Sequence, residues 1–374
     1  MNNRKILITG GGTGGHISPG IAIYEECRDQ NIPCWLLVGN RDSRFTYLNE
    51  VDERSLMFYG APRFTKNPFK IPLFLLKFLF SSLKIRRFIR KKGITDVIGM
   101  GGYVSAPALF AAKQMKKNIW LCEQNVVPGK VTQLFIRHAM GVFSTFKNCT
   151  RFIDSRYHDK IILAGNPIRK NVLTDVDKKD ALKKFNLSHC SRVILAIGGS
   201  QGAQQINDLV LQLKMKYAKE LINTGIIWCT GAGTFEKYKA LLAENNLMGS
   251  IYISPFVEEI GYAYAASDLA ISRSGSGVMV EMAAMELPSI LIPYPYAAMN
   301  HQSHNADEFV EANAAVKIEG KDITVEALAE SVFRILDNKN RYNGMRESCL
   351  KEAKTEAASF ILKFIGDYNN AVSK

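Results

Sequence analysis

The sequence contains no Cys-x-x-Cys pair and no apolar run long enough to cross a bilayer. Its seven cysteines are scattered and odd in number: Cys27, Cys34, Cys122, Cys149, Cys190, Cys229 and Cys349. This pattern argues against a disulfide framework and a cysteine-based zinc site, and it favours a reducing compartment. The most apolar segment, 71–83, contains Lys77 and two serines and is too short for a transmembrane helix. Since residues 1–5 are polar, no signal peptide is predicted, and we expect a soluble or peripheral protein.

Acidic residues are missing between Glu53 and Asp96, where eleven basic residues occur. Residues 1–168 hold 25 Lys and Arg against 11 Asp and Glu, a net charge of +14, and the remainder carries −1. A field of this kind favours an anionic partner, either a membrane surface or a nucleic acid. No zinc finger, RNA-binding signature or aromatic stacking platform accompanies the charge, so nucleic-acid binding is the weaker interpretation.

Strands and helices alternate along the chain of 374 residues, which is long enough for two α/β domains. We expect strands over 5–9, 33–38, 96–100 and 118–122, with helices over 18–30 and 106–116. A further strand is expected from about residue 161, before Gly165, and a polar crossover follows at 171–184. The alternation then restarts, with strands over 192–197, 226–230 and 289–293 and helical composition over 352–370. Such alternation predicts βαβ units and parallel sheets. The fold class is therefore α/β, with two Rossmann-like halves facing a cleft.

Three glycine loops follow predicted strands, at 10–16, 101–103 and 198–203. The first formally contains G-x-G-x-x-G, which suggests a dinucleotide site. That interpretation needs an acidic residue at the end of the second strand, which instead ends Gly39-Asn40-Arg41. Any one such loop is commonplace, but three of them at the carboxyl ends of strands indicate a site that handles several phosphates.

A further polar cluster comprises Ser272-Arg273-Ser274-Gly275, Glu281, and His301 with Gln302 and Asn305. An ionised carboxylate such as Glu281 can accept hydrogen bonds from both hydroxyls of a ribose. Taken alone, each of these residues would be read as an ordinary surface residue. His301 and His304 are spaced i, i+3 without a third ligand nearby, so no metal site is predicted.

Several motifs in order along the chain resemble those of the MurG family, the peptidoglycan N-acetylglucosaminyltransferases of glycosyltransferase family 28. The motifs are Gly-Gly-Thr-Gly-Gly-His at 11–16, Gly-Gly-Tyr at 101–103, Glu-Gln-Asn at 123–125, Gly-Asn-Pro-Ile-Arg at 165–169, Gly-Gly-Ser-Gln-Gly-Ala at 198–203, Ser-Arg-Ser-Gly with Glu281, and His-Gln-x-x-Asn-Ala at 301–306. Together they cover nearly the whole chain, so the resemblance is specific.

The resemblance implies a GT-B fold, with two Rossmann-like domains and parallel sheets facing a deep cleft. Residues 1–168 would bind the acceptor and the membrane, and residues 169–354 would bind the UDP-sugar donor. A helix over about 355–374 would pack back on the first domain. The implied reaction is an inverting transfer of N-acetylglucosamine from UDP-N-acetylglucosamine to the C4 hydroxyl of the muramyl-pentapeptide of lipid I, giving lipid II. It would use no metal and no cofactor.

Residue roles follow from the same resemblance. The donor side would comprise Thr13, Gly14, Gly15, Asn125, Arg169, Ser200, Phe256, Val257, Glu281 and Gln302, where Arg169 and Ser200 contact the diphosphate and Glu281 the ribose. The acceptor side would comprise Gly14, Gly15, His16, Gly101, Gly102 and Tyr103. His16 is the first candidate base, because imidazole titrates near neutral pH, and Glu123 is the second. Each has an alternative: His16 would merely bind the acceptor, and Glu123 would orient Asn125. Asn300 departs from the family, which often has an acidic residue there.

The segment 70–92 is predicted to contact the membrane. Phe74, Leu75, Phe78 and Leu79 fall on one helical face, with cations that include Lys70, Lys77, Arg86 and Arg87 around them. The alternative is a helix with a buried apolar face and a solvated basic one. A peripheral position on the cytoplasmic face of the plasma (inner) membrane follows, with an anionic membrane surface as partner and no nucleic acid. Which cell-wall and division proteins the chain meets stays open. A UDP-N-acetylglucosamine 2-epimerase, which shares the GT-B architecture, is the nearest rival function.

Overall fold

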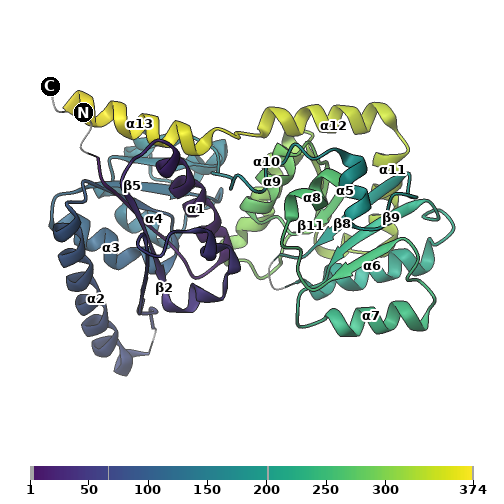
Figure 1. Ribbon diagram of the computed structural model, residues 1–374, viewed down its shortest axis with the longest axis horizontal. Helices are drawn as coiled ribbons and strands as arrows, with labels where there is room; N and C mark the ends of the chain where they lie inside the picture. The colour runs from purple at the N-terminus through teal and green to yellow at the C-terminus, as the bar shows by residue number, and fades with distance from the viewer. Residues whose placement is uncertain (1–3, 66, 200–201, 373–374) are drawn as a thin grey trace. The chain divides into compact units, whose positions relative to one another are not determined.

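The computed structural model describes residues 4–65, 67–199 and 202–372. The chain divides into two compact units (Figure 1). Unit 1 comprises Met1–Arg169 and Lys354–Lys374, and unit 2 comprises Lys170–Ala353. Unit 2 is thus inserted in the sequence of unit 1, whose last helix comes from the end of the chain.

Unit 1 is built on a seven-stranded parallel sheet with strand order β3-β2-β1-β4-β5-β6-β7. The strands are β1 (Ile6–Thr9), β2 (Cys34–Gly39), β3 (Leu56–Tyr59), β4 (Asp96–Gly99), β5 (Asn118–Glu123), β6 (Gly141–Ser144) and β7 (Ile161–Leu163). The helices are α1 (Gly14–Asp29), α2 (Ile71–Lys92), α3 (Gly102–Gln114), α4 (Lys130–Phe135) and α13 (Ala357–Val372). The central strands β1 and β4 are short, fully buried and mostly apolar, as expected for strands that are covered on both faces.

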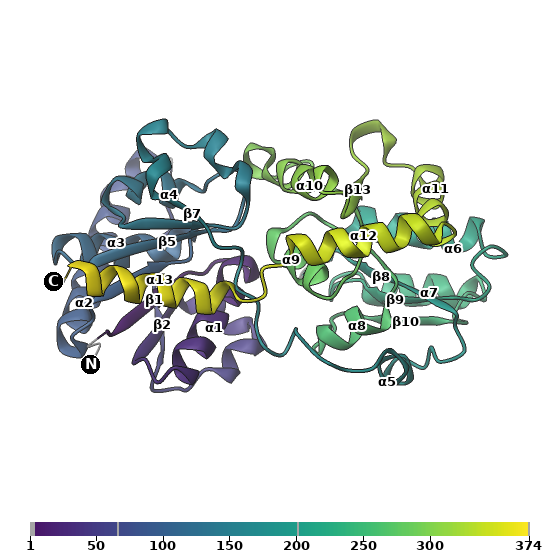
Figure 2. The ribbon, with the colours of Figure 1, turned by 90° about the horizontal axis from the view of Figure 1, so that it is seen from above.

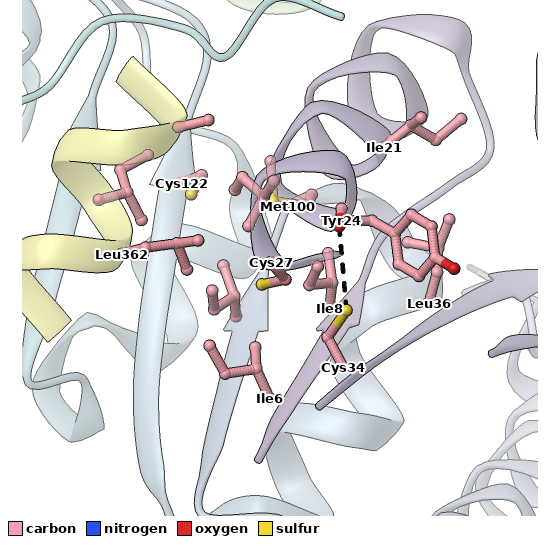
Figure 3. Close-up of a cluster of buried hydrophobic side chains, with 14 of the residues drawn as sticks. Ile6, Ile8, Ile21, Tyr24, Cys27, Cys34, Leu36, Met100, Cys122 and Leu362 are labelled. Atoms are coloured by element: carbon pink, nitrogen blue, oxygen red, sulfur yellow. Dashed lines mark hydrogen bonds between the residues drawn. The ribbon is translucent and has the colours of Figure 1, made fainter. Parts of the chain in front are cut away.

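The C-terminal helix completes one of the two hydrophobic layers of unit 1. Figure 2 shows α13, in yellow, running along unit 1 beside α1. Its buried side chains Ala358, Ile361, Leu362 and Ile365 belong to the same apolar cluster as Ile6 and Ile8 of β1. The close-up in Figure 3 shows Leu362 facing Cys122 and Cys27 across this cluster. A fully buried aliphatic side chain contributes roughly 1.5–3 kcal/mol, so α13 is an integral part of unit 1.

Unit 2 repeats the plan with a six-stranded parallel sheet of order β10-β9-β8-β11-β12-β13. Its strands are β8 (Arg192–Ile197), β9 (Thr224–Cys229), β10 (Ile251–Ser254), β11 (Leu269–Ser272), β12 (Ser289–Leu291) and β13 (Ala315–Lys317). Its helices are α5 (Lys178–Lys184), α6 (Gln204–Lys216), α7 (Phe235–Glu244), α8 (Ile260–Ala266), α9 (Ser276–Ala284), α10 (His301–Glu311), α11 (Val325–Leu336) and α12 (Lys339–Glu352).

The expected α/β class with two Rossmann-like parallel sheets is confirmed. Some expected boundaries are wrong. α1 and α3 begin at Gly14 and Gly102, four residues earlier than predicted, and each contains an internal proline. The C-terminal stretch is broken between Glu352 and Ala357 into α12 and α13.

Strand order reverses direction between β1 and β4 in unit 1, and between β8 and β11 in unit 2. At such a switch point the connections leave the sheet towards opposite faces, so the loops at the carboxyl ends of the two strands leave room for a ligand. All three predicted glycine loops follow β1, β4 or β8. The topology therefore places them where open α/β sheets bind ligands.

Candidate functional site

The loops after β1 and β4 approach each other so closely that glycine is required. Gly12 and Gly101 have φ values of +89° and +85°, in the region that favours glycine. A Cβ atom on Gly102 would lie 2.4 Å from the carbonyl oxygen of Gly11, and one on Gly12 would lie 3.0 Å from the ring of Tyr103. The structure thus brings together two of the three glycine loops and Tyr103, which were predicted for the acceptor.

His16 lies in the first turn of α1, against the second of these loops. Its Nδ1 is 2.8 Å from the hydroxyl oxygen of Thr13, the N-cap residue of α1. A Cβ atom on Gly101 would lie 3.2 Å from His16 Nε2. Gly14 and Gly15 are the first two residues of the helix, where backbone N–H groups have no intrahelical acceptor and favour an anion. Here an imidazole and an anion-binding helix end are adjacent.

Asp42, which no sequence motif indicated, shapes the first glycine loop. Its side chain is only 1% exposed, and its two carboxylate oxygens accept hydrogen bonds from the N–H groups of Gly12 and Gly39, both at 2.9 Å. A Cβ atom on Gly11 would lie 2.2 Å from Asp42 Oδ2. The missing acidic residue of the dinucleotide pattern is thus present three residues later. Its carboxylate binds the backbone of Gly12 and Gly39, so it shapes the loop from within the protein.

Glu123, the second candidate base, is buried and surrounded by donors. Its carboxylate accepts hydrogen bonds from the N–H groups of Asn125 at 3.1 Å and Gly129 at 2.9 Å, and from the hydroxyl of Thr132 at 2.6 Å. Burial raises the pKa of Glu123, and these hydrogen bonds partly offset the shift. The arrangement fixes the loop that follows β5, including Asn125, which was predicted to hold the donor sugar.

Arg169 ends the first segment of unit 1 and is held there by three groups. Its Nε donates to the Ser18 hydroxyl at 3.2 Å, its Nη1 lies 3.8 Å from a carboxylate oxygen of Glu50, and its guanidinium lies 4.8 Å from the centre of the Tyr47 ring. Ser18 belongs to α1, and a Cβ atom on Gly14 would lie 3.0 Å from the Tyr47 hydroxyl. A fixed cation therefore lies near the beginning of α1.

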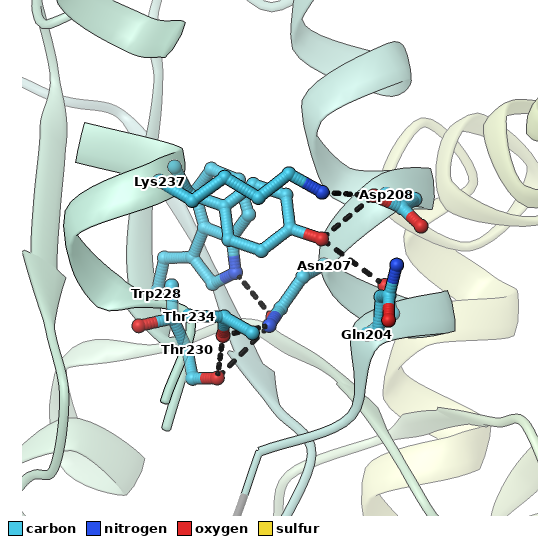
Figure 4. Close-up of polar contacts among 8 residues, drawn as sticks. Gln204, Asn207, Asp208, Trp228, Thr230, Thr234 and Lys237 are labelled. Atoms are coloured by element: carbon cyan, nitrogen blue, oxygen red, sulfur yellow. Dashed lines mark hydrogen bonds and ion pairs between the residues drawn. The ribbon is translucent and has the colours of Figure 1, made fainter. Parts of the chain in front are cut away.

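In unit 2, a network of polar side chains around Asn207 joins the first turn of α6 to β9 and to the loop that follows β9 (Figure 4). Asn207 Nδ2 donates to the Thr230 carbonyl at 2.9 Å, and its Oδ1 accepts from the Trp228 indole at 2.9 Å. Gly202, with φ of +77°, packs against the same segment, because a Cβ atom there would lie 2.1 Å from the Thr230 carbonyl oxygen. Ser200, the predicted diphosphate contact, lies outside the described residues.

Glu281 is held by a residue that sequence analysis did not single out. Its Oε2 accepts a hydrogen bond from the hydroxyl of Tyr264 at 2.9 Å, and Tyr264 is 1% exposed. These residues lie on α9 and α8, on either side of β11 in the sequence. An ionised carboxylate can accept several hydrogen bonds, so a carboxylate oriented in this way suits a pair of hydroxyl donors.

Gln302 is oriented in a similar way, because its Oε1 accepts from the N–H of Tyr294 at 2.9 Å. The Gln302 Nε2 group is a donor that can form hydrogen bonds with other acceptors. Asn300, the departure from the family, has φ of +53° and ψ of 28° at the beginning of α10. Asparagine tolerates this left-handed conformation better than most residues, which gives the substitution a physical reason.

Phe256 and Val257 follow β10 and differ in exposure. The Phe256 ring is 44% exposed, whereas Val257 is buried. The Ser254 hydroxyl donates to the Phe256 carbonyl at 2.7 Å and fixes this turn.

Within residues 4–65, 67–199 and 202–372, no three His, Cys, Asp or Glu side chains are grouped so that they could hold a metal ion.

The structure corrects the expected apolar face of α2. Phe74 and Phe78 are half-buried, and the Phe78 ring lies 5.5 Å from that of Phe110 on α3. Leu75 and Leu79 are exposed as predicted, at 56% and 47%, and the exposed surface also includes Leu73, Leu76, Phe80 and Leu83. The buried residues of α2 are Ser82, Ile85 and Ile89, which are spaced at helical intervals and face the core. This orientation of the helix turns the Phe74 and Phe78 rings towards the protein.

The two halves of α2 expose different chemistry. Before residue 84 the exposed side chains are mostly apolar, and from residue 84 onward they are Lys84, Arg87, Arg90 and Lys91. Among the helices that the structure describes, neither α2 nor any other is both long and apolar enough to span a membrane.

Comparison with known proteins identifies the family. The model of the glycosyltransferase family 28 N-terminal domain matches residues 6–144, and that of the family 28 C-terminal domain matches residues 193–361. The UDP-N-acetylglucosamine–N-acetylmuramyl-(pentapeptide) pyrophosphoryl-undecaprenol N-acetylglucosamine transferase of Halothermothrix orenii is 33% identical, over 97% of this chain and 98% of the relative. The protein of the same name from Finegoldia magna is 32% identical, over 96% of each chain.

Solved structures agree on the fold. The crystal structure of Acinetobacter baumannii MurG aligns with a TM-score of 0.73 at 24% identity, covering 97% of this chain and 99% of that one. A putative UDP-N-acetylglucosamine 2-epimerase from Listeria monocytogenes aligns with a TM-score of 0.72 at 15% identity, covering 98% and 97%. Both likenesses concern the GT-B-like architecture alone, whereas the family models and the sequence relatives are specific. The chain belongs to glycosyltransferase family 28 and, within it, to the MurG family.

Proposed function

We propose that this glycosyltransferase moves N-acetylglucosamine from UDP-N-acetylglucosamine to the C4 hydroxyl of the muramyl-pentapeptide of lipid I, and so makes lipid II. The observation that carries the proposal is full-length similarity to transferases whose names state this donor sugar and acceptor. The glycine loops at the two switch points support it, because each offers backbone N–H groups to a phosphate.

The donor would bind mainly to unit 2. Glu281, oriented by Tyr264, would accept hydrogen bonds from the ribose hydroxyls, and the exposed ring of Phe256 would pack on the uracil beside Val257. The Nε2 of Gln302 would donate to the sugar, with Asn125, Thr13, Gly14 and Gly15 of unit 1 as further contacts. Arg169 and Ser200 would stabilise the diphosphate.

The acceptor would bind to unit 1, at the beginning of α1 and at Gly101, Gly102 and Tyr103. His16 is the proposed base: its ring nitrogen removes the proton from the C4 hydroxyl as the oxygen bonds to the anomeric carbon and UDP leaves with the electrons of the broken bond. Glu123 is better suited to positioning Asn125 than to proton transfer, because both carboxylate oxygens already accept hydrogen bonds.

Stabilisation of the leaving UDP would come from Arg169, from hydroxyl groups and from backbone N–H groups, so the proposed reaction needs no metal ion. Fixed donors that face the developing negative charge require no reorganisation during the reaction, and this makes them effective catalysts.

Membrane contact is proposed for α2, with a peripheral location on the cytoplasmic face. Its exposed apolar half would enter the lipid interface while the basic half binds anionic headgroups, where the polyprenyl acceptor is anchored. Of the cations predicted to contact the membrane, Lys70, Lys77 and Arg87 are exposed and Arg86 is half-buried. This geometry fits a helix that lies on the membrane surface.

The test is transfer of radiolabelled N-acetylglucosamine from its UDP donor to a lipid I analogue in the presence of EDTA. We expect transfer by the wild type to survive EDTA. Glu281→Ala should raise the donor KM by roughly tenfold or more, since hydrogen bonds to a charged group contribute ~1.5–3 kcal/mol. Tyr264→Phe should raise it less.

Glu330→Ala is the matched control, because Glu330 is an exposed residue of α11 in the same unit. Loss of transfer on adding EDTA would overturn the metal-free mechanism. Formation of the mannosamine epimer of the donor, without a lipid-linked product, would identify an isomerase instead.

A further inference from the structure

Gln124 carries a buried amide group whose nitrogen lacks a hydrogen-bond partner among the described residues. It follows β5 directly and is 3% exposed. Its Nε2 is shielded from solvent, and no acceptor for it lies within the part of the chain that the structure describes. Leaving such a donor unpaired costs about 1–3 kcal/mol, and buried polar groups are nearly always paired. An orphaned donor that persists therefore needs an explanation.

The position of Gln124 is fixed by its two neighbours in the sequence. Glu123 accepts hydrogen bonds from Asn125, Gly129 and Thr132, so the backbone on both sides of Gln124 is anchored. The orphaned amide is thus part of a rigid segment, and it cannot be attributed to a loosely placed surface side chain.

The amide lies beside the proposed base. A Cβ atom on Gly101 would lie 3.2 Å from His16 Nε2 and 3.5 Å from Gln124 Oε1. The imidazole and the amide therefore border the same small volume, above a residue that must be glycine. A ligand atom close to His16 would also be close to Gln124.

We infer that Gln124 binds the acceptor, and that its Nε2 donates a hydrogen bond to an uncharged oxygen of the sugar whose hydroxyl His16 deprotonates. The inference rests on the proposed function. A neutral amide suits a hydroxyl, ether or acyl oxygen, whereas the acceptor's diphosphate has the N–H groups and the positive dipole end of α1 available. Before the acceptor binds, the donor is unpaired; when it binds, the donor is satisfied.

This role has a consequence for specificity. A site with a buried donor discriminates strongly against a ligand that lacks the matching acceptor, because the donor then stays unpaired. Gln124 would therefore help to select the sugar of the acceptor while having little influence on the UDP donor.

The test compares Gln124→Met and Gln124→Leu with the wild type, by steady-state kinetics for each substrate and by thermal unfolding. Both variants replace an unpaired polar group by an apolar one, so we expect an unchanged or higher Tm. The acceptor kcat/KM should fall about tenfold, the equivalent of one hydrogen bond of about 1.4 kcal/mol. The donor KM should stay within about twofold of the wild-type value.

Gln30→Met is the matched control, since Gln30 is exposed at the end of α1 and its amide is paired with Glu26. Two results overturn the inference: an unchanged acceptor kcat/KM, or a lower Tm with both KM values raised, which indicates a merely structural role. A wild type that transfers no sugar would overturn the proposed function itself, and the inference with it, before any variant is compared.

Discussion

Two buried carboxylates of unit 1 bind the protein's own backbone. Asp42 accepts from Gly12 and Gly39, and Glu123 accepts from Asn125 and Gly129. A carboxylate that satisfies two N–H groups fixes a loop without needing a regular element on either side. At the scale of single residues, both acids are therefore better suited to shape the ligand-binding loops than to react.

The pH dependence of transfer tests this assignment for Glu123. A catalytic base must be deprotonated, so activity falls as the pH drops through the pKa of the base. Burial raises the pKa of Glu123 above the ordinary value for glutamate. We expect Glu123→Gln to lower kcat, because the loop loses a hydrogen bond, but to leave the midpoint of the acidic limb of the kcat profile unchanged. If the acidic limb disappears in this variant, Glu123 is the base. His16→Gln serves as the comparison, since it should remove that limb.

Helix α2 illustrates how one element can carry two surface chemistries in succession. Its inner face packs on α3, while its outer face changes from apolar to cationic near residue 84. A helix with apolar and charged side chains mixed along its outer face would simply be solvated. Separate apolar and cationic halves instead favour contact with a bilayer, which has an apolar interior and anionic headgroups.

Vesicle binding tests the two halves separately. Replacing both Leu79 and Phe80 by Ser should lower partitioning onto phosphatidylglycerol vesicles at least about tenfold, because apolar burial is lost. Changing Lys84, Arg87 and Arg90 to Gln should weaken binding by about 1 kcal/mol per charge and should reduce its dependence on salt.

The matched control replaces Met215 and Ile222 of unit 2 by Ser, because these residues are similarly exposed, at 48% and 71%. Partitioning that is unaffected by the α2 variants, or equally reduced by the control, would show that α2 does not enter the lipid interface.

The alternation of strand and helix patterns, with glycines after the strands, predicted the parallel sheets and the three glycine loops. They did not indicate β3, β6, β10, β11 or β13, because short apolar runs of three or four residues carry no period of their own. Both faces of α2 are apolar in its first half, so the sequence could not show that Phe74 and Phe78 turn inward.

The polar contacts of the site were less predictable. The hydrogen bond between Tyr264 and Glu281 depends on how α8 and α9 pack around β11, and the orphaned state of Gln124 depends on burial. The donor, acceptor and base assignments themselves came from motif resemblance and stay predictions until the proposed experiments are done.

At the scale of the whole molecule, unit 1 depends on a helix that is distant in the sequence. Besides its apolar residues, α13 contributes Asn369, whose amide donates to both carboxylate oxygens of the buried Asp96 at 3.1 and 3.2 Å. Trp120 and Asn118 donate to the same carboxylate. The end of the chain thus closes a polar network as well as an apolar layer.

Shortening a buried side chain of α13 should destabilise unit 1 and leave unit 2 unaffected. We expect Ile361→Ala to cost roughly 2–5 kcal/mol, as for other buried aliphatic truncations, and to lower by several degrees the calorimetric transition of unit 1. UDP affinity, proposed to reside mainly in unit 2, should be little changed at temperatures below that transition. Phe360→Ala is the control on the same helix, because Phe360 is 42% exposed. Equal effects of the two substitutions would contradict a core role for α13.

Unit 1 consists of two segments that are separated in the sequence by unit 2, and this affects the order in which the units can fold during synthesis. Domains generally fold from the N-terminus onward as the ribosome releases them. Here residues 1–169 lack the helix that covers one face of their sheet until residues 354–374 have been made. Unit 2, which is continuous, has all its residues earlier. The unit whose synthesis begins first is therefore completed second, and until then one apolar face of its sheet lacks the helix that covers it.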